Sequence, residues 1–249
     1  MKAMVLAAGL GTRLRPLTDD RPKALLEIEG QTLLEMTLGR LRSFGIGEVI
    51  VNVHHLGDMI VKYLRTNRNF GMRIEVSQED VLLDTGGGLK KAAWFFLENH
   101  AGRGQPFVVH NVDVLSTIDL DRMLQFHTEH GGLATLAVQR RKSSRYLLFD
   151  EELQLCGRQV EQDQTTAAAR PVEKAQPLAF CGIHVVSPRI FSLMMEDGVF
   201  SIIDTYLRLA EQGEKLLAFR ADDYYWRDLG TPDNLKQAAE DIQRGALLP

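Results

Sequence analysis

The stretch from Met4 to Leu26, MVLAAGLGTRLRPLTDDRPKALL, joins a short apolar strand to a basic, glycine-containing loop. Residues 2–7 predict a buried strand, and the next residues predict an ordered loop that contains Gly9 and Gly11. Glycine lets backbone N–H groups turn toward one point and lets a ligand approach closely, as phosphate-binding loops require. Open α/β sheets bind their ligands at the carboxyl ends of the strands. The stretch therefore predicts an anion site directly after the first strand.

Basic side chains dominate the rest of this loop. They are Arg13, Arg15, Arg21 and Lys23, opposed only by Asp19 and Asp20. A dinucleotide-binding fingerprint would need glycine where Leu14 stands, and a Walker loop would need Gly-Lys-Ser/Thr, which this stretch lacks. The alternative is a basic surface loop in an ordinary α/β protein. The length of the whole run favours the anion site.

The remaining sequence alternates helical and strand-like patterns. Strands are predicted over residues 48–53, 73–76, 105–110, 133–138, 178–186 and 215–220, and helices over 32–44, 56–64, 89–97, 120–130, 190–194, 202–210 and 232–242. This order is typical of a doubly wound, mostly parallel sheet with helices on both faces. We expect an α/β protein built as a single domain over residues 1–249.

Composition excludes several partners. The net charge of −4 and the pI near 6.0 argue against general nucleic-acid binding, which needs a basic face. Cys156 and Cys181 form neither a metal-ligand spacing nor an evident disulfide framework. No apolar run approaches the ~18 residues of a membrane span, and the chain starts with a strand instead of a signal segment. We expect a cytoplasmic protein with no membrane or nucleic-acid partner.

Residues Gly9–Thr18 (GLGTRLRPLT), followed by Pro22 and Lys23, resemble the signature of the sugar-1-phosphate nucleotidyltransferases, also called NDP-sugar pyrophosphorylases. The resemblance implies a Rossmann-like fold and transfer of a nucleoside monophosphate from an NTP to a sugar 1-phosphate, with release of pyrophosphate. It implies that Arg13 and Lys23 are catalytic and neutralise the nucleotide phosphates. The nucleotide contacts it implies in this loop are Ala7, Ala8, Gly9, Gly11, Thr12 and Arg13.

A second glycine-rich segment, Asp84–Gly88 (DTGGG), precedes the helical pattern that starts at Leu89. From the residues alone, a plain turn explains it about as well as a ligand site does. In the family, the comparable turn contacts the nucleobase, so the resemblance adds Gln78, Thr85, Gly86 and Gly87 to the nucleotide site. The triple-glycine form is most similar to that of short bacterial members that make UDP-N-acetylmuramic acid. We therefore expect UTP and an N-acetylamino-sugar 1-phosphate as substrates.

Asp113 follows the predicted strand 105–110 and is a candidate magnesium ligand, because Mg²⁺ usually takes one or two carboxylates together with phosphate oxygens. Spacing alone leaves open that Asp113 caps a turn. The family has a catalytic, metal-binding aspartate here, usually after glycine, where this chain has Val112. Trp226–Thr231 (WRDLGT) resembles the family's Trp-x-Asp-x-Gly-Thr motif, whose aspartate, here Asp228, is the second metal carboxylate. The expected cofactor is Mg²⁺ on Asp113 and Asp228.

The resemblance divides the chain into a nucleotide-binding part, about residues 1–140, and a sugar-binding part with the C-terminal helix, about 141–249. The implied sugar contacts are Asn111, Glu173, Lys174, Gly182 and Asp228. A hairpin over residues 146–149 and 153–156 and a mobile polar loop over 159–169 predict a small β-rich flap beside the sugar. From the residues alone, Glu173 and Lys174 form a surface salt bridge equally well. The run Arg140–Lys142 is either solvated surface or a rim that faces the substrate.

Other functions remain open at this level. One is GTP- or CTP-dependent transfer to mannose or heptose 1-phosphate or to phosphocholine. Another is a non-catalytic sensor of nucleotide sugars, although the presence of both metal carboxylates argues against it. The expected partners are a nucleoside triphosphate and a sugar 1-phosphate, and the chain is a monomer or a homodimer.

Overall fold

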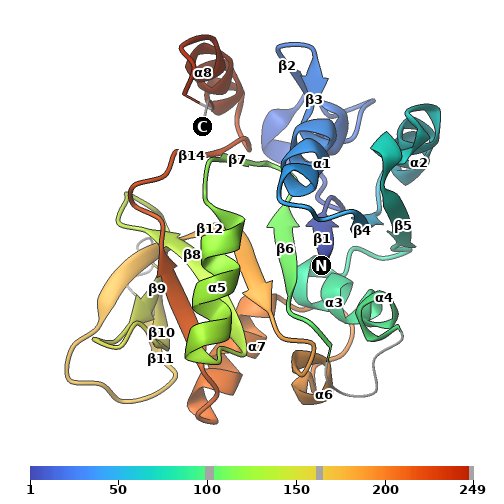
Figure 1. The fold of residues 1–249 in the computed structure, drawn as a ribbon. Coiled ribbons are helices and arrows are strands. Elements are labelled where there is room, and N and C mark those ends of the chain that lie inside the picture. Colours follow the sequence, from blue (N-terminus) through green and yellow to red (C-terminus); the bar gives the residue numbers. More distant parts are fainter. Residues whose placement is uncertain (99–103, 161–164, 247–249) are drawn as a thin grey trace.

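The computed structural model describes residues 1–98, 104–160 and 165–246. A ten-stranded sheet lies at its centre (Figure 1). Its first half consists of parallel strands in the order β6, β1, β4, β5. Their bounds are β1 (Lys2–Leu6), β4 (Glu48–Val53), β5 (Arg73–Gln78) and β6 (Phe107–Asn111). The apolar runs that predicted these strands are therefore central strands of one sheet.

The sheet continues through one reversed strand. β12 (Gln176–Val186) lies antiparallel between β6 and β8 (Ala134–Gln139), and β13 (Leu216–Arg220) pairs parallel with β8. Because β12 is antiparallel to both of its neighbours, β8 and β13 run in the same direction as β1. The mostly parallel sheet predicted from the sequence is confirmed.

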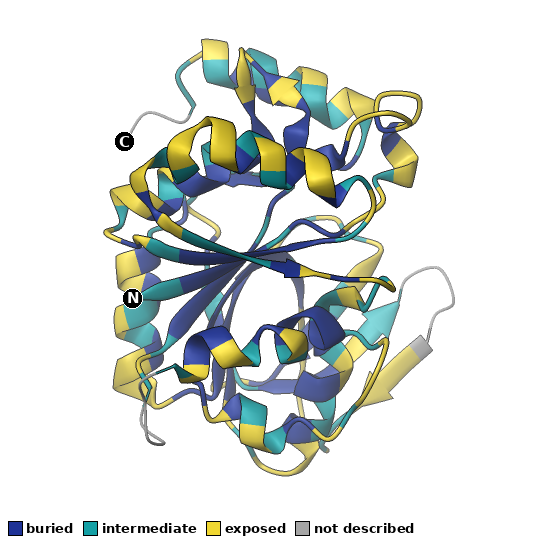
Figure 2. Cartoon of the chain, turned by 90° about the vertical axis from the view of Figure 1, so that its right-hand side faces the viewer, coloured by how far each residue is buried: buried dark blue, intermediate teal, exposed yellow. Residues whose placement is uncertain are grey.

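Helices cover both faces of the sheet, which Figure 2 shows edge-on between two helical layers. One apolar core contains side chains of α1 (Leu33–Ser43), α2 (Gly57–Thr66), α5 (Leu120–His130) and α8 (Pro232–Gln243). The other contains side chains of α3 (Asp84–Lys91), α4 (Ala93–Leu97), α6 (Ile190–Leu193) and α7 (Ile202–Glu211). Successive residues of β1 alternate between them: Ala3 and Val5 enter the first core and Met4 the second. The doubly wound arrangement is thereby confirmed.

A small antiparallel sheet extension forms the predicted β-rich flap. It consists of β9 (Arg145–Phe149), β10 (Leu155–Val160) and β11 (Thr165–Ala168), and β9 joins it to the first residues of β12. The prediction of a loop over residues 159–169 is wrong for 159–160, which end β10, and for 165–168, which form β11; residues 161–164 lie outside the described residues. Gly157 makes this pairing possible, because a Cβ there would lie 2.7 Å from the Ala167 carbonyl oxygen.

The segment Asp84–Gly88 was expected to be a turn, and the structure corrects this: it forms the first turns of α3. Gly86, Gly87 and Gly88 are buried residues of this helix. A Cβ on Gly86 would lie 2.4 Å from the Phe200 ring, and one on Gly87 would lie 2.3 Å from the Gly198 carbonyl oxygen. Close packing against the segment before α7 therefore explains these glycines, although glycine is a poor helix former.

We expect Gly87→Ala to destabilise the fold by about 1–3 kcal/mol, because the new methyl group overlaps backbone that cannot move freely. Gly39→Ala is the matched control, since Gly39 is an exposed glycine of α1 with no atom within 4 Å of its Cβ position. Alanine there should raise the free energy of unfolding by roughly 0.5–1 kcal/mol. Urea denaturation measures both variants, and equal stability of the two would contradict the packing argument.

None of the described helices is long and apolar enough to cross a membrane. Both cysteines, Cys156 and Cys181, are buried and free.

Candidate active site

The loop after β1 folds tightly over its own continuation. Gly11 has a φ of +64°, and a Cβ there would lie 2.9 Å from the Thr18 methyl carbon and 3.3 Å from the Lys23 Cβ. The Thr18 hydroxyl donates to the Gly11 carbonyl oxygen at 2.9 Å. Glycine at position 11 therefore lets Thr18 and Lys23 pack against the loop. At Gly9 no described atom lies within 4 Å of the Cβ position, so this part of the loop is open to a ligand.

A cavity of about 480 Å³ lies beside this loop, at the carboxyl ends of β1 and β6. Of the predicted nucleotide-binding and catalytic residues, those that line it are Ala7, Ala8, Gly9, Gly11, Thr12, Arg13, Lys23, Thr85 and Asp113. Gln78, Gly86 and Gly87 are not among the described lining residues. The Gln78 amide oxygen instead lies 3.2 Å from the Cβ position of Gly57, at the start of α2. The structure thus brings the first loop and Thr85 together, but not the other predicted base contacts.

Lys23 and Asp113 form an ion pair in this cavity. Lys23 belongs to a short 3₁₀ helix (Lys23–Leu25), and its ammonium group donates to the Asp113 carboxylate. Their side chains are 10% and 21% exposed, so solvent screens this pair less than a surface pair. Val112, which stands where the family usually has glycine, is buried in the core with its N–H bonded to the Leu6 carbonyl oxygen at 3.1 Å. The valine side chain is thus accommodated by the apolar core.

A short pair of strands brings Asp228 close to the backbone of Asp113. β14 (Trp226–Asp228) runs antiparallel to β7 (Val114–Ser116), with Asp228 opposite Val114. The Leu229 N–H donates to the Asp113 carbonyl oxygen at 2.8 Å. Directly opposed Cα atoms are ~4.5–5.5 Å apart, so the two aspartates start from adjacent backbone. This short sheet converts two aspartates distant in sequence into neighbours.

Arg13 lies beside Asp228, at the same end of the sheet as Lys23 and Asp113. Its Nη2 atom and the Asp228 Oδ1 atom each lie 2.6 Å from the position that a Cβ of Gly230 would take. The Gly230 N–H donates to Asp228 Oδ1 at 2.9 Å. The glycine of the WRDLGT motif is therefore required because any side chain would displace Arg13 or Asp228.

The donor set suits a divalent cation of the magnesium type. Asp113 and Asp228 provide carboxylates, and the ammonium group of Lys23 already holds Asp113 in an ion pair. The described residues contain no group of three or more His, Cys, Asp or Glu side chains that could hold a metal by themselves. A site with two carboxylates needs oxygens from water or substrate to complete the coordination, which is how Mg²⁺ is usually bound beside phosphates.

A second cavity, of about 530 Å³, shares Arg13 and Asn111 with the first. Asn111, Gly182 and Asp228, all predicted sugar contacts, line it. Gly182 has a φ of +72°, and a Cβ there would lie 2.8 Å from the Asn111 amide nitrogen. Burial raises the pKa of the neighbouring Cys181 thiol to about 12, so this side chain is not a nucleophile at neutral pH. The site thus has two adjoining cavities that meet at Arg13 and Asn111.

A model of the nucleotidyl transferase family matches residues 2–245. The chain belongs to this family. It is 34% identical over 250 residues to the N-acetylmuramate alpha-1-phosphate uridylyltransferase of Caulobacter vibrioides, covering 96% of this chain and 95% of that protein. It is 31% identical to the mannose-1-phosphate guanyltransferase of Pichia angusta, covering 93% of this chain but only 61% of the longer relative. These matches confirm the family resemblance and the prediction of a nucleotidyltransferase enzyme.

Solved structures agree with the fold described above. The crystal structure of HddC from Yersinia pseudotuberculosis, complexed with GMP-PN, matches with a TM-score of 0.75 at 20% identity, covering 97% of this chain and 99% of that one. At this identity the likeness concerns the fold alone, and it supports the doubly wound α/β arrangement.

Glu173 and Lys174, which the family resemblance assigned to the sugar, lie elsewhere in this nucleotidyl transferase. Both are exposed, and the Lys174 ammonium group lies 3.8 Å from the Glu151 carboxylate, with side chains 80% and 73% exposed. The pair precedes β12, whose first residue, Gln176, is roughly 20 Å along the strand from Gly182. The structure therefore places the pair outside both cavities, and the alternative interpretation, a surface salt bridge, describes what it shows for Lys174.

Asn52 and Glu79 are site residues that the sequence interpretation missed. The Ala7 N–H donates to Asn52 Oδ1 at 2.7 Å, and Asn52 Nδ2 donates to Glu79 Oε1 at 2.7 Å. The Leu83 N–H donates to the other Glu79 oxygen at 3.0 Å. These buried side chains fix the start of the phosphate loop relative to the segment before α3. The sequence contained a signal, because Asn52 interrupts the apolar run 49–53 near the carboxyl end of the strand.

Proposed function

We propose that this nucleotidyl transferase transfers UMP from UTP to an N-acetylamino-sugar 1-phosphate and releases pyrophosphate. The observation that carries this proposal is the convergence of Arg13, Lys23, Asp113 and Asp228 where the two cavities adjoin. Two cavities of several hundred cubic ångströms suit a nucleotide and a sugar phosphate. The relative from Caulobacter vibrioides, similar over nearly the full length of both chains, supports this choice of base and sugar.

The chemistry needs positioning and charge neutralisation more than a base. An oxygen of the sugar phosphate attacks the α-phosphorus of UTP in line, a new P–O bond forms, and the bond to the β-phosphate oxygen breaks. Because the attacking phosphate is already ionised, no protein group has to remove a proton. The N–H groups of residues 9–12 and the Arg13 guanidinium would hold the departing pyrophosphate. The Lys23 ammonium group would neutralise charge that develops around the α-phosphorus.

Asp113 and Asp228 would hold Mg²⁺. When bound, this ion would neutralise charge on the reacting phosphate oxygens. Without a cation, two adjacent carboxylates would repel a triphosphate and each other. Lys23 offsets the charge of Asp113 in the described structure, and the Arg13 guanidinium lies beside Asp228. A triphosphate would bring further negative charge to this position, which supports a divalent ion between the phosphates and the two carboxylates.

The experiment that tests this function is a screen of pyrophosphate release. UTP, GTP, CTP and dTTP are each combined with N-acetylglucosamine 1-phosphate, N-acetylmuramic acid 1-phosphate, mannose 1-phosphate or phosphocholine. We expect the highest kcat/KM with UTP and an N-acetylated sugar. A kcat/KM with GTP at least about tenfold above that with UTP, a difference of ~1.4 kcal/mol, would reject the uridine assignment. Nucleotide-sugar binding without any pyrophosphate release would instead indicate a sensor.

A further inference from the structure

A single arginine on the wall of the second cavity is unusually constrained. Arg141 follows β8, and its guanidinium carbon lies 3.7 Å from the centre of the Trp226 ring. The Trp226 indole N–H donates to the Cys181 carbonyl oxygen at 2.7 Å, which fixes the ring. Arg141 Nη2 donates to the Phe180 carbonyl oxygen at 2.8 Å. The guanidinium is thus held in one orientation by β12 and β14.

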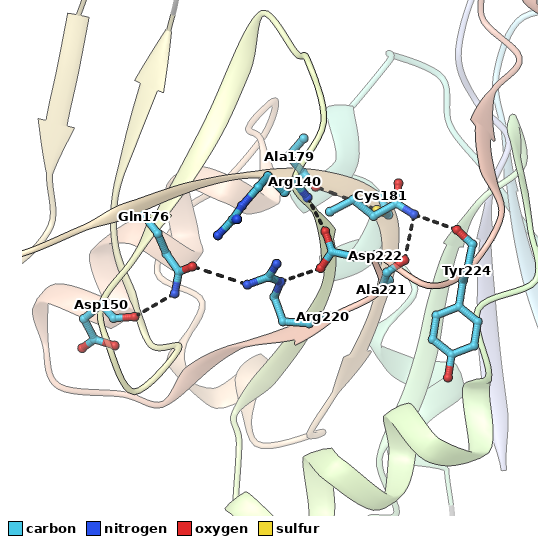
Figure 3. A network of polar contacts seen from close by, with 10 residues as sticks. Arg140, Asp150, Gln176, Ala179, Cys181, Arg220, Ala221, Asp222 and Tyr224 are labelled. Atoms are coloured by element: carbon cyan, nitrogen blue, oxygen red, sulfur yellow. Dashed lines mark hydrogen bonds and ion pairs between the residues drawn. The ribbon is translucent and has the colours of Figure 1, made fainter.

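The backbone before Arg141 is also fixed. The Arg140 N–H donates to the Asp222 carboxylate at 2.7 Å, as Figure 3 shows. Gln139 donates from its side-chain amide to carbonyl oxygens of the segment 221–224, at 2.8 and 2.9 Å. A residue held from both sides in this way loses little conformational entropy when it binds a ligand.

Arg141 nevertheless forms no direct ion pair with a carboxylate of the described residues. Within this part of the chain, its Nε atom is shielded from solvent without a hydrogen-bond partner. Burial lowers the pKa of Arg141, and the more distant charge of Asp228, which lines the same cavity, only partly opposes this shift. By contrast, Arg227 on the same wall is paired with Asp241 at 2.7 Å. A partly desolvated cation with unused donors is costly unless a ligand completes its bonding.

The charges of this cavity favour an anionic ligand. Arg13 and Lys142 also line it, and Asp228 is the acidic residue among the described lining residues. Arg13 lies where the two cavities adjoin, so it serves the phosphates of the proposed reaction. Arg141 lines the second cavity and not the first. An anionic group on the sugar itself would therefore reach Arg141 in the second cavity.

We propose that Arg141, supported by the Trp226 ring, determines specificity by binding a carboxylate of the sugar substrate. The inference rests on the proposed function and narrows its acceptor to acidic sugar 1-phosphates. A guanidinium matches a carboxylate with two parallel charge-assisted hydrogen bonds, a geometry that lysine does not reproduce. The carboxylate can belong to the ring, as in a uronic acid, or to an ether substituent, as in muramic acid.

The test compares matched acceptors that differ only in the carboxylate group. The pairs are N-acetylmuramic acid 1-phosphate with N-acetylglucosamine 1-phosphate, and glucuronic acid 1-phosphate with glucose 1-phosphate. We expect the wild type to prefer the acidic member of one pair, and that pair identifies the source of the carboxylate. Arg141→Gln should lower kcat/KM for the preferred acidic sugar by roughly 10–100-fold, mainly through KM, and lower it much less for its neutral partner. Arg141→Lys should restore only part of the preference.

Arg140→Gln is the matched control, because only the backbone of this neighbouring arginine takes part in the contact with Asp222. This variant should leave the ratio between acidic and neutral acceptors unchanged. An equal loss for both members of a pair in Arg141→Gln would show a contact to the shared phosphate or a structural role, and would overturn the inference. So would a wild type without preference for either acid.

A binding measurement separates this inference from the proposed function. The chain has two tryptophans, so Trp94→Phe leaves Trp226 as the single indole reporter. Free N-acetylmuramic acid or glucuronic acid should change its fluorescence, and N-acetylglucosamine and glucose should do so far less. If no acceptor releases pyrophosphate, the proposed function fails, and this titration still decides the inference. Equal responses to acidic and neutral sugars, or no response, would overturn it.

Discussion

Asp113→Asn and Asp228→Asn should each lower kcat by at least about 10²–10³-fold while the protein stays folded. Asparagine has nearly the same shape as aspartate but lacks the charge, so the variant loses affinity for a divalent cation and gains little strain. Because the pairing of β7 with β14 places the two aspartates on adjacent backbone, we expect them to act as a unit. The double variant should therefore be little slower than either single variant. Steady-state kinetics at increasing Mg²⁺ measure this, and higher Mg²⁺ should restore part of the activity.

Asp204→Asn is the control for this series. Asp204 lies on α7, pairs with Arg158 at 2.6 Å, and its side chain is 52% exposed. Its replacement should leave kcat and the Mg²⁺ dependence unchanged. Near-normal turnover of Asp113→Asn or Asp228→Asn at low Mg²⁺ would exclude that aspartate as a metal ligand.

Lys23→Ala should lower kcat by about 10²–10³-fold and raise KM for the sugar phosphate, because it removes a buried positive charge from the place where charge develops. The Lys23 side chain is 10% exposed, and its ammonium group is bonded to Asp113. The variant therefore also leaves the Asp113 carboxylate without its partner. Initial rates with UTP and the best sugar phosphate measure both constants.

Arg21→Ala tests whether position or mere basicity matters in this loop. Arg21 pairs with Glu27 at 3.4 Å on the surface, with 48% of its side chain exposed. Its replacement should change kcat less than about threefold, because exposed ion pairs contribute little. If Arg21→Ala and Lys23→Ala were equally active, the basic residues of the loop would be an ordinary charged surface.

Local pattern was enough to predict the fold and the position of the first loop at the carboxyl end of β1. The apolar runs of β1, β4 and β6 and the helical spacing between them define a parallel sheet, and ligands bind at the carboxyl ends of its strands. Gly11 and Asp113 follow the ends of β1 and β6 closely in sequence, so their proximity follows from topology, whereas Lys23 lies much farther along the chain and was assigned through the family resemblance. Asp228 could be placed only because its motif resembles that of the family, since the β7–β14 pairing has no local signal.

The features that the sequence did not reveal depend on packing between distant segments. The glycine run of α3 has the local pattern of a turn. Its true cause is the close packing of Gly86 and Gly87 against Phe200 and Gly198. Glu173 and Lys174 match a motif, but the register of β12 carries them away from the cavity. Arg141 gains its constraint from Trp226 and Phe180, which lie far along the chain. Each of these contacts joins residues whose proximity only the folded chain determines.

A crystal structure with a UDP-sugar product and Mn²⁺ in place of Mg²⁺ tests the central claim most directly. The account predicts that the diphosphate lies beside residues 9–13, with the sugar in the cavity that Gly182 lines. It also predicts that the anomalous signal of the metal lies within coordination distance, or one bridging water, of both Asp113 and Asp228. A metal more than ~6 Å from either carboxylate, too far for a water-mediated contact, would contradict the account, as would a nucleotide bound elsewhere.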